Sequence, residues 1–213
     1  MKITPVKTPL IAKKMFPNYI WDIPNQAKEL YLTFDDGPTP EITNWTLDQL
    51  KQYNAKATFF CVGANIKKHP DIFKGIINNG HTIGNHTQHH VKGWKTKTKT
   101  YIKDVLDAEE HIELHQQKKS NLFRPPYGQI KPKQGKKLME LGYKIIMWDV
   151  LSFDWQEKTT EAECLENVLS KTKVGSIIVF HDSIKASKNM MYALPKVLEH
   201  FDNKGYAFKS LVI

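Results

Sequence analysis

Arginine is nearly absent from this 213-residue sequence, because Arg124 is the only one and all the other members of its 31 basic residues are lysines. The basic residues outnumber the 22 acidic ones and give a formal net charge of +9, which suits an anionic partner. Proteins that bind nucleic acid rely on arginine for bidentate contacts, so its shortage argues against a nucleic-acid partner. The shortage also marks Arg124 as a position where lysine does not serve.

Cysteine and long apolar runs are scarce as well. The two cysteines, Cys61 and Cys164, lie far apart and in no metal-binding spacing. Cys61 belongs to an apolar run, so we expect a buried thiol there. No apolar run is long enough to cross a bilayer, which predicts the absence of an integral membrane segment. The first residues have no apolar core of the kind an export signal needs. We expect either a cytoplasmic protein or an exported one whose signal lies outside this sequence.

Segments typical of strands alternate with segments typical of helices along most of the chain. The predicted strands cover residues 31–34, 57–62, 81–85, 122–124, 143–150, 176–180 and 206–208. The predicted helices cover residues 39–53, 70–78, 101–115, 132–141, 160–171 and 189–201. The helix over 39–53 is expected to begin with Thr39 as its N-cap and Pro40 in its first turn. This alternation predicts an α/β fold with mostly parallel strands, either open or closed into a barrel.

Two segments fall outside this alternation. Residues 1–28 hold four prolines and no clear period, so we expect an N-terminal arm packed on a single domain formed by residues 29–213, with Phe16, Tyr19 and Trp21 as anchors. Residues 92–100 carry four lysines and no acid. They are interpreted either as a clamp for a polyanion or, more simply, as a solvated loop before a helix.

The stretch Tyr31–Pro38, which reads Tyr-Leu-Thr-Phe-Asp-Asp-Gly-Pro, combines a short buried strand with two adjacent carboxylates. The Gly-Pro pair ends the strand abruptly, so Asp35 and Asp36 lie at its carboxyl end. Side chains of neighbouring residues on an extended chain point to opposite sides. Asp35 and Asp36 are therefore expected to serve different partners, although a polar turn alone would also account for them.

Ionisable residues follow four other predicted strands in the same way. They are His86–His90 after 81–85, Arg124 after 122–123, Asp154 shortly after 143–150, and His181 after 176–180. In a parallel barrel the carboxyl ends of all strands meet at one mouth. We therefore expect these clusters to converge there.

The histidine cluster predicts a metal site. His86 and His90 are four residues apart, so on a helical turn they would share one face. Two imidazoles and a carboxylate, with Asp36 as the obvious carboxylate, form a ligand set typical of catalytic zinc with an open fourth position. Surface histidines in a polar loop are the alternative interpretation.

At this point the residues resemble a family. The segments Thr33-Phe34-Asp35-Asp36-Gly37-Pro38, His86-Thr87-x-x-His90, Arg124-Pro125-Pro126-Tyr127-Gly128, Asp154-Trp155 and Val179-Phe180-His181-Asp182 resemble, in order, the five motifs of the polysaccharide deacetylases with the NodB-homology domain, carbohydrate esterase family four. The resemblance spans about residues 31–211. It implies a distorted (β/α) barrel with fewer than eight repeats and the removal of acetyl groups, mostly N-acetyl, from chitin oligomers, peptidoglycan, xylan or related glycans.

The resemblance also implies a role for each matching residue. Asp36, His86 and His90 would hold a divalent metal, usually zinc. Asp35 would be the general base, held in place by Arg124. The chemistry of arginine adds that its planar fork can brace a carboxylate in two places at once. His181 would be the general acid, tuned by Asp154. The substrate would meet Pro126, the wall formed by Trp155, and the main-chain N–H of Tyr127, which would donate to the oxyanion.

Several alternatives stay open at this point. An O-acetyl esterase acting on xylan-like glycans would use the same residues. A non-catalytic glycan-binding or nucleic-acid-binding protein would use only the basic surface. His181 and Asp154 could be structural residues that close the barrel. We favour an N-acetylated glycan or oligosaccharide as the partner of a monomeric enzyme.

Overall fold

The computed structural model describes residues 5–25, 27–117 and 119–213. Its strands are β1 Glu29–Asp35, β2 Thr58–Cys61, β3 Thr82–Asn85, β4 Leu122–Phe123, β5 Lys144–Ile145, β6 Val150–Leu151, β7 Ile177–His181 and β8 Ala207–Phe208. Its α-helices are α1 Leu10–Met15, α2 Ile42–Gln52, α3 Gly63–Lys68, α4 Pro70–Asn78, α5 Thr98–Gln116, α6 Pro132–Glu140, α7 Glu161–Lys171 and α8 Ser187–Asn203. Two short 3₁₀ helices, η1 Gly93–Lys95 and η2 Pro126–Gly128, lie in loops.

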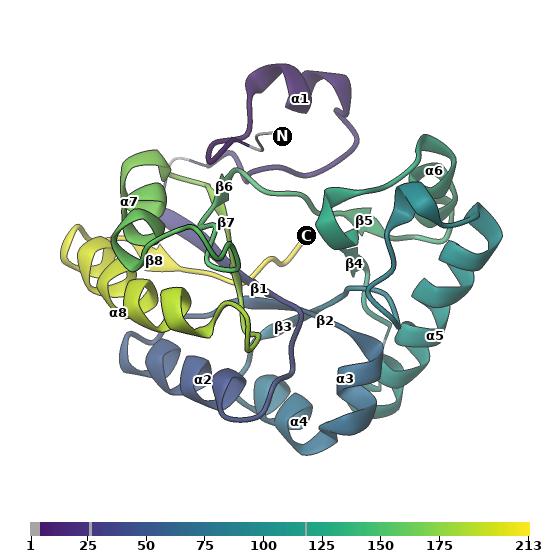
Figure 1. Cartoon of the computed structure of the whole chain (residues 1–213), viewed down its shortest axis with the longest axis horizontal. Helices are drawn as coiled ribbons and strands as arrows, with labels where there is room; N and C mark the ends of the chain where they lie inside the picture. Colours follow the sequence, from purple (N-terminus) through teal and green to yellow (C-terminus); the bar gives the residue numbers. More distant parts are fainter. Residues whose placement is uncertain (1–4, 26, 118) are drawn as a thin grey trace.

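The strands form one curled parallel sheet in the order β5-β4-β3-β2-β1-β7-β6, and β8 pairs with β1 outside that path. Helices α2 to α8 surround the sheet, so the predicted distorted (β/α) barrel with fewer than eight repeats is confirmed (Figure 1). The central strand β1 pairs with β2 on one side and β7 on the other. Its residues Leu30, Leu32 and Phe34 are fully buried in the main apolar core. The end of β1 therefore lies in the middle of the mouth.

The N-terminal arm spans the opening between the edge strands β5 and β6. Ile20 pairs with Ile146 after β5, and Lys7 pairs with Val150 in β6. Helix α1 lies outside this opening (Figure 1). The buried carboxylate of Asp149, between the two strands, forms ion pairs with Lys7 at 2.5 Å and with Lys13 at 2.6 Å. The arm thus supplies the contacts that a further strand would make in a complete barrel.

The three aromatic anchors predicted for the arm differ in how closely they pack on the domain. Tyr19 and Trp21 pack against a second core cluster, beneath α5 and α6. Phe16 is 40% exposed and stacks on Tyr19. The buried thiol predicted for Cys61 is confirmed. No helix in residues 5–25, 27–117 and 119–213 is both long and apolar enough to cross a membrane.

The long strand predicted over 143–150 is wrong, because the chain forms only β5 and β6 and bends between them. Arg124 explains the break, since its guanidinium takes the main-chain carbonyls of Ile146 and Met147 that a continuous ladder would use. The N-cap prediction at Thr39 is also wrong. Helix α2 begins at Ile42, after Glu41 with a φ of 66°. Helices α1 and α3 were not predicted, and residues 98–100 of the expected loop form the first turn of α5.

Candidate active site

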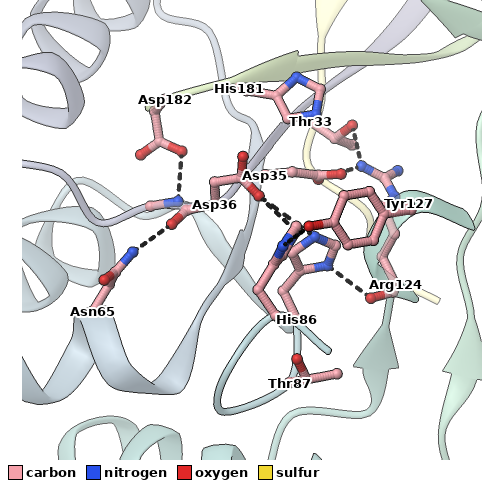
Figure 2. Close-up of polar contacts among 12 residues, drawn as sticks. Thr33, Asp35, Asp36, Asn65, His86, Thr87, Arg124, Tyr127, His181 and Asp182 are labelled. Atoms are coloured by element: carbon pink, nitrogen blue, oxygen red, sulfur yellow. Dashed lines mark hydrogen bonds and ion pairs between the residues drawn. The ribbon is translucent and has the colours of Figure 1, made fainter. Parts of the chain in front are cut away.

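Asp35 and Asp36 lie at the end of β1 and face different partners, as the alternation predicted. Asp35 is 4% exposed and pairs with Arg124, whereas Asp36 faces His86 and His90 (Figure 2). Asp36 has a φ of 80°, which is rare for a residue other than glycine. Its carbonyl accepts a hydrogen bond of 2.7 Å from Asn65 Nδ2, so the unusual backbone is held by α3.

Asp182, which directly follows β7, holds the same turn from the other side. Its Oδ1 accepts the N–H of Gly37 at 3.1 Å, and its Oδ2 accepts the hydroxyl of Thr43 at 2.5 Å. A Cβ atom at Gly37 would lie 2.0 Å from Asp182 Oδ2, so only glycine fits there. Burial and the charge of Asp36 raise the pKa of Asp182 to about 8, against the lowering by its hydrogen bonds. The sequence analysis assigned no role to Asp182.

The three expected metal ligands converge. Asp36 Oδ1 lies 3.1 Å from His90 Nε2 and 3.7 Å from His86 Nε2, and one ligand atom from each residue falls within 4.8 Å of the others. His86 Nδ1 lies 2.7 Å from the carbonyl oxygen of Arg124, which leaves Nε2 as an acceptor. His90 Nδ1 lies 3.1 Å from the hydroxyl of Tyr127, which can donate or accept, and this contact orients the ring.

These residues fit a divalent cation. Asp36 Oδ1 is buried and has no hydrogen-bond partner among the described residues, although it is surrounded by nitrogen ligands. Burial on its own would raise the pKa of Asp36, but His90, His181 and His86 lower it by a larger amount. The net pKa is lowered, so the carboxylate stays ionised. Burial lowers the pKa of His86 to about 4, so its imidazole is neutral and can bind a cation. A carboxylate with two imidazoles is a donor set suited to zinc and related metals.

The helical turn expected between the two histidines is wrong, because residues 86–90 form no helix. Thr87 and His90 have positive φ angles of 66° and 54°. Asp104 of α5 shapes this turn, since its Oδ2 accepts the N–H groups of Gln88 and His89, both at 3.0 Å. His86 and His90 therefore point to the same side because Asp104, on a separate helix, holds the irregular turn between them.

Arg124 is fully buried and holds Asp35 through one contact. Its Nη1 donates to Asp35 Oδ1 and to Thr33 Oγ1, each at 2.7 Å. Nη2 donates to the carbonyl of Met147 at 2.9 Å, and Nε donates to that of Ile146 at 3.3 Å. The prediction that Arg124 contacts the Asp35 carboxylate at two points is therefore wrong. The planar fork joins three strand ends instead, which a lysine could not do.

His181 and Asp154 form a pair on the opposite wall. His181 Nδ1 lies 2.8 Å from Asp154 Oδ1, and the main-chain N–H of His181 donates to Asp154 Oδ2 at 2.7 Å. Burial lowers the pKa of His181, but Asp154 and then Asp36 and Asp35 raise it, and the result is about 9. The indole of Trp155 lies against the imidazole, with ring centroids 4.6 Å apart. Nε2 remains for a molecule in the cavity.

A cavity of about 520 Å³ joins these groups. Among the predicted residues, it is lined by Asp35, Asp36, His86, His90, Tyr127, Trp155 and His181. Pro126 is buried in η2 and is not among the residues that line the cavity, whereas Pro125 is. Tyr127 stands at the rim with a φ of 59°. Its main-chain N–H makes no hydrogen bond within the described residues.

Sequence reasoning missed Asp104, Asp182, Thr33 and the hydroxyl of Tyr127. Two of these had a signal in the chain, because Asp182 adjoins His181 and Thr33 lies two residues before Asp35 on the same side of the strand. Asp104 had none, since it lies 18 residues after His86 on a different element and meets the turn only through the tertiary fold.

The fold and the site define a carbohydrate-active hydrolase scaffold, and the comparison with known proteins identifies it. Residues 22–146 match the model of the polysaccharide deacetylase family, and the chain belongs to that family, as the resemblance predicted. A peptidoglycan-N-acetylglucosamine deacetylase of Bacillus cereus is 34% identical over 203 residues, which are 93% of this chain and 94% of that protein. PdaC of Bacillus subtilis, a peptidoglycan-N-acetylmuramic acid deacetylase, is 31% identical over 86% of this chain and 38% of its own length.

A solved structure is similar throughout. The Bc1960 peptidoglycan N-acetylglucosamine deacetylase, in complex with 4-naphthalen-1-yl-N-oxidanyl-benzamide, matches with a TM-score of 0.88 and 35% identity. The match covers 96% of this chain and 95% of that one. The likeness therefore extends over nearly the whole fold.

Proposed function

We propose that this chain is a metal-dependent hydrolase that removes N-acetyl groups from N-acetylated sugars of a glycan and releases acetate and a free amine. The observation that carries the proposal is the convergence of Asp36, His86 and His90 beside the Asp35–Arg124 pair in one cavity. The relatives named for N-deacetylation of peptidoglycan support an amide substrate over an O-acetyl ester. All five groups come from a single chain, so the proposed site is complete without a second copy.

Asp36, His86 and His90 would hold the cation, and zinc is the metal that this ligand set favours. Such a cation polarises a carbonyl and lowers the pKa of water. Asp35 would take the proton of the attacking water, since the hydrogen bond from Arg124 Nη1 orients its carboxylate. The N–H of Tyr127 would donate to the acetamide oxygen as negative charge develops on it.

His181 would complete the reaction. Its Nδ1 is held by Asp154, so Nε2 would deliver a proton to the departing amine nitrogen. An amide nitrogen leaves poorly unless it is protonated, which makes this proton part of bond breaking. The same oxygen of Asp154 that orients the ring also stabilises its charged form.

The test is acetate release from N-acetylglucosamine oligomers by the protein with zinc, after chelation, and after readdition of metal. We expect release that requires metal and that falls by about 10³-fold or more in Asp35→Asn, because the base is then absent. The exposed Asp71→Asn is the matched control and is expected to keep full activity. Metal-loaded protein that releases acetate only from O-acetylated xylan would contradict the amide assignment.

A further inference from the structure

Helix α1 carries its apolar residues on the outside of the molecule. Leu10, Ile11 and Met15, its outer apolar face, are 70%, 69% and 67% exposed, and every residue of the helix is exposed or half-buried. None of the three belongs to a core cluster of the described residues. A surface helix normally turns its apolar stripe toward the core and its charges toward water. The polarity of α1 is therefore inverted.

The side of α1 that faces the domain carries a charge instead. Lys13 forms ion pairs with Asp22 and, at 2.6 Å, with the fully buried Asp149. Just before the helix, Thr8 donates its N–H to the carbonyl of Asp149 at 2.9 Å and its hydroxyl to that of Trp148 at 2.7 Å. These contacts fix the orientation of α1. The outer apolar face cannot turn inward unless Lys13 leaves its two carboxylates.

The surface around the outer apolar face is cationic. Lys14 is exposed one turn after Leu10, on the same side of the helix. Lys171 is exposed at the end of α7, and its carbonyl accepts a hydrogen bond of 2.9 Å from Lys7 Nζ, in the arm. Residues 5–21 contain no acid. The exposed charge beside the apolar side chains is therefore positive.

The combination of apolar and positively charged side chains selects among the partners that this surface could meet. A second copy of the chain would bring its own net charge of +9 to the contact, which opposes self-association. A polyanion would neutralise the lysines and leave the outer apolar face in water. An anionic lipid bilayer accommodates both, because apolar side chains enter the boundary between head groups and acyl chains while lysines stay among the head groups. Helix α1 also projects beyond the ring of the other helices, where a broad surface can reach it (Figure 1).

We propose that α1 is a membrane-contact element, in which the outer apolar face enters the surface of an anionic lipid bilayer and Lys14 pairs with its head groups. The contact goes beyond the proposed deacetylation and does not depend on it. Three apolar side chains and a few lysines are too few for a permanent anchor, so binding is reversible and weakens with salt. Because Thr8 holds Trp148, which lines the cavity, the bound protein keeps one cavity wall close to the lipid surface.

Binding to vesicles tests the contact without any need for activity. The full chain is sedimented with vesicles of phosphatidylcholine alone and with vesicles of equal parts phosphatidylcholine and phosphatidylglycerol, at low and at high salt. The variants are Leu10→Ser/Ile11→Ser for the apolar face and Lys14→Gln for the charge. The midpoint of urea unfolding verifies that each variant is folded. The matched controls alter exposed side chains of the same types elsewhere on the surface, and they are Leu114→Ser/Ile184→Ser and Lys136→Gln.

We expect the wild type to bind the anionic vesicles about tenfold or more tightly than the neutral ones at low salt, and to lose most of that preference at high salt. Leu10→Ser/Ile11→Ser should weaken binding to the anionic vesicles about tenfold or more, because two apolar side chains no longer leave water. Lys14→Gln should weaken it about threefold to fivefold, the scale of one lysine near an anionic surface. Both controls should bind as the wild type does.

Failure of the wild type to bind anionic vesicles would overturn the membrane contact. Equal binding by the wild type and Leu10→Ser/Ile11→Ser would overturn it as well, because the net charge of the protein would then account for the affinity. Sedimentation velocity without lipid examines the other occupant. A monomer is expected, whereas a dimer that the two serine substitutions dissociate would assign the outer apolar face to a second copy of the chain.

Discussion

Two histidine–carboxylate pairs of almost the same geometry lie in different regions of this molecule. In the cavity wall, His181 Nδ1 is 2.8 Å from Asp154 Oδ1. Outside it, His89 Nδ1 is 2.6 Å from Asp104 Oδ1. The side chain of His181 is 15% exposed, whereas that of His89 is 64% exposed. The distance within a histidine–carboxylate pair therefore says little about its role. The role depends on how deeply the pair is buried and on which groups surround it.

The second oxygen of each carboxylate makes the difference clearer. Asp154 Oδ2 accepts the N–H of His181 itself, so both oxygens orient one imidazole toward the cavity. Asp104 Oδ2 accepts the N–H groups of Gln88 and His89, which lie in sequence between the two histidines proposed as metal ligands. The first pair presents a ring nitrogen to the cavity, and the second shapes the backbone that carries the proposed metal site.

The largest contrast is expected from removing the two imidazoles. His181→Ala should lower kcat by about 10³-fold, because a general acid contributes on that scale. His89→Ala should stay within about twofold of the wild type, because an exposed pair contributes little. Acetate release from chitotetraose at saturating metal measures both. Similar losses in the two variants would mean that His181 is structural.

Arg124→Lys should have the next largest effect, although it keeps the charge. Lysine cannot reach Asp35, Thr33 and the carbonyls after β5 together, so Asp35 should shift and kcat should fall by about 10²-fold. Unfolding by urea should show a loss of about 2–4 kcal/mol, because buried acceptors lose their donors. Lys103→Gln, which breaks the exposed pair with Asp107, is the control and should leave both quantities unchanged. Wild-type activity in Arg124→Lys would refute the bracing of Asp35.

The pH dependence of the cavity pair gives a smaller effect. The pKa of His181 is raised from 6.5 to about 9, so the charged imidazole stabilises the fold. This stabilisation should be fully present below about pH 6.5 and should be lost as the pH rises through about 9. NMR titration of metal-free protein should place the midpoint of His181 near 9, and Asp154→Asn should move it down toward 6.5. A midpoint that ignores Asp154→Asn would contradict the assigned cause.

The smallest expected effect concerns the outer pair. Asp104→Ala should raise the Kd for zinc about tenfold, because partners behind a ligand shell typically contribute that much. His89→Ala keeps Asp104 Oδ2 as the acceptor of both N–H groups and should bind zinc as the wild type does. Competition with a chromophoric chelator measures both values. Equal affinity in the two variants would show that the turn keeps its shape without Asp104.

Local patterns in the sequence predicted the placement of the site better than its shape. The rule that parallel strands end at one mouth brought Asp35, Arg124 and His181 together correctly, because it depends only on strand order and direction. The helical spacing of His86 and His90 pointed to the correct pair for a wrong reason, since the turn is set by Asp104 from a distant helix.

Other errors have the same origin. The apolar run over 143–150 suggests a continuous strand, and nothing within it reveals that Arg124 will take its carbonyls. The lysines of 92–100 suggest a solvated loop, and the side chain that fixes it, Gln134, lies about 40 residues later in the chain. Contacts between distant segments decide these features, and periodicity carries no information about them.

The N-terminal arm across β5 and β6 has a consequence for folding during synthesis on the ribosome. Lys7 meets Asp149, a partner 142 residues away in the chain. At typical elongation rates, the segment made first would wait about 7–30 s for the residues that receive it. Strand β1 likewise waits for β7. We expect the nascent chain to expose its central strand until translation is nearly over, so slowing late codons should increase its demand for chaperones.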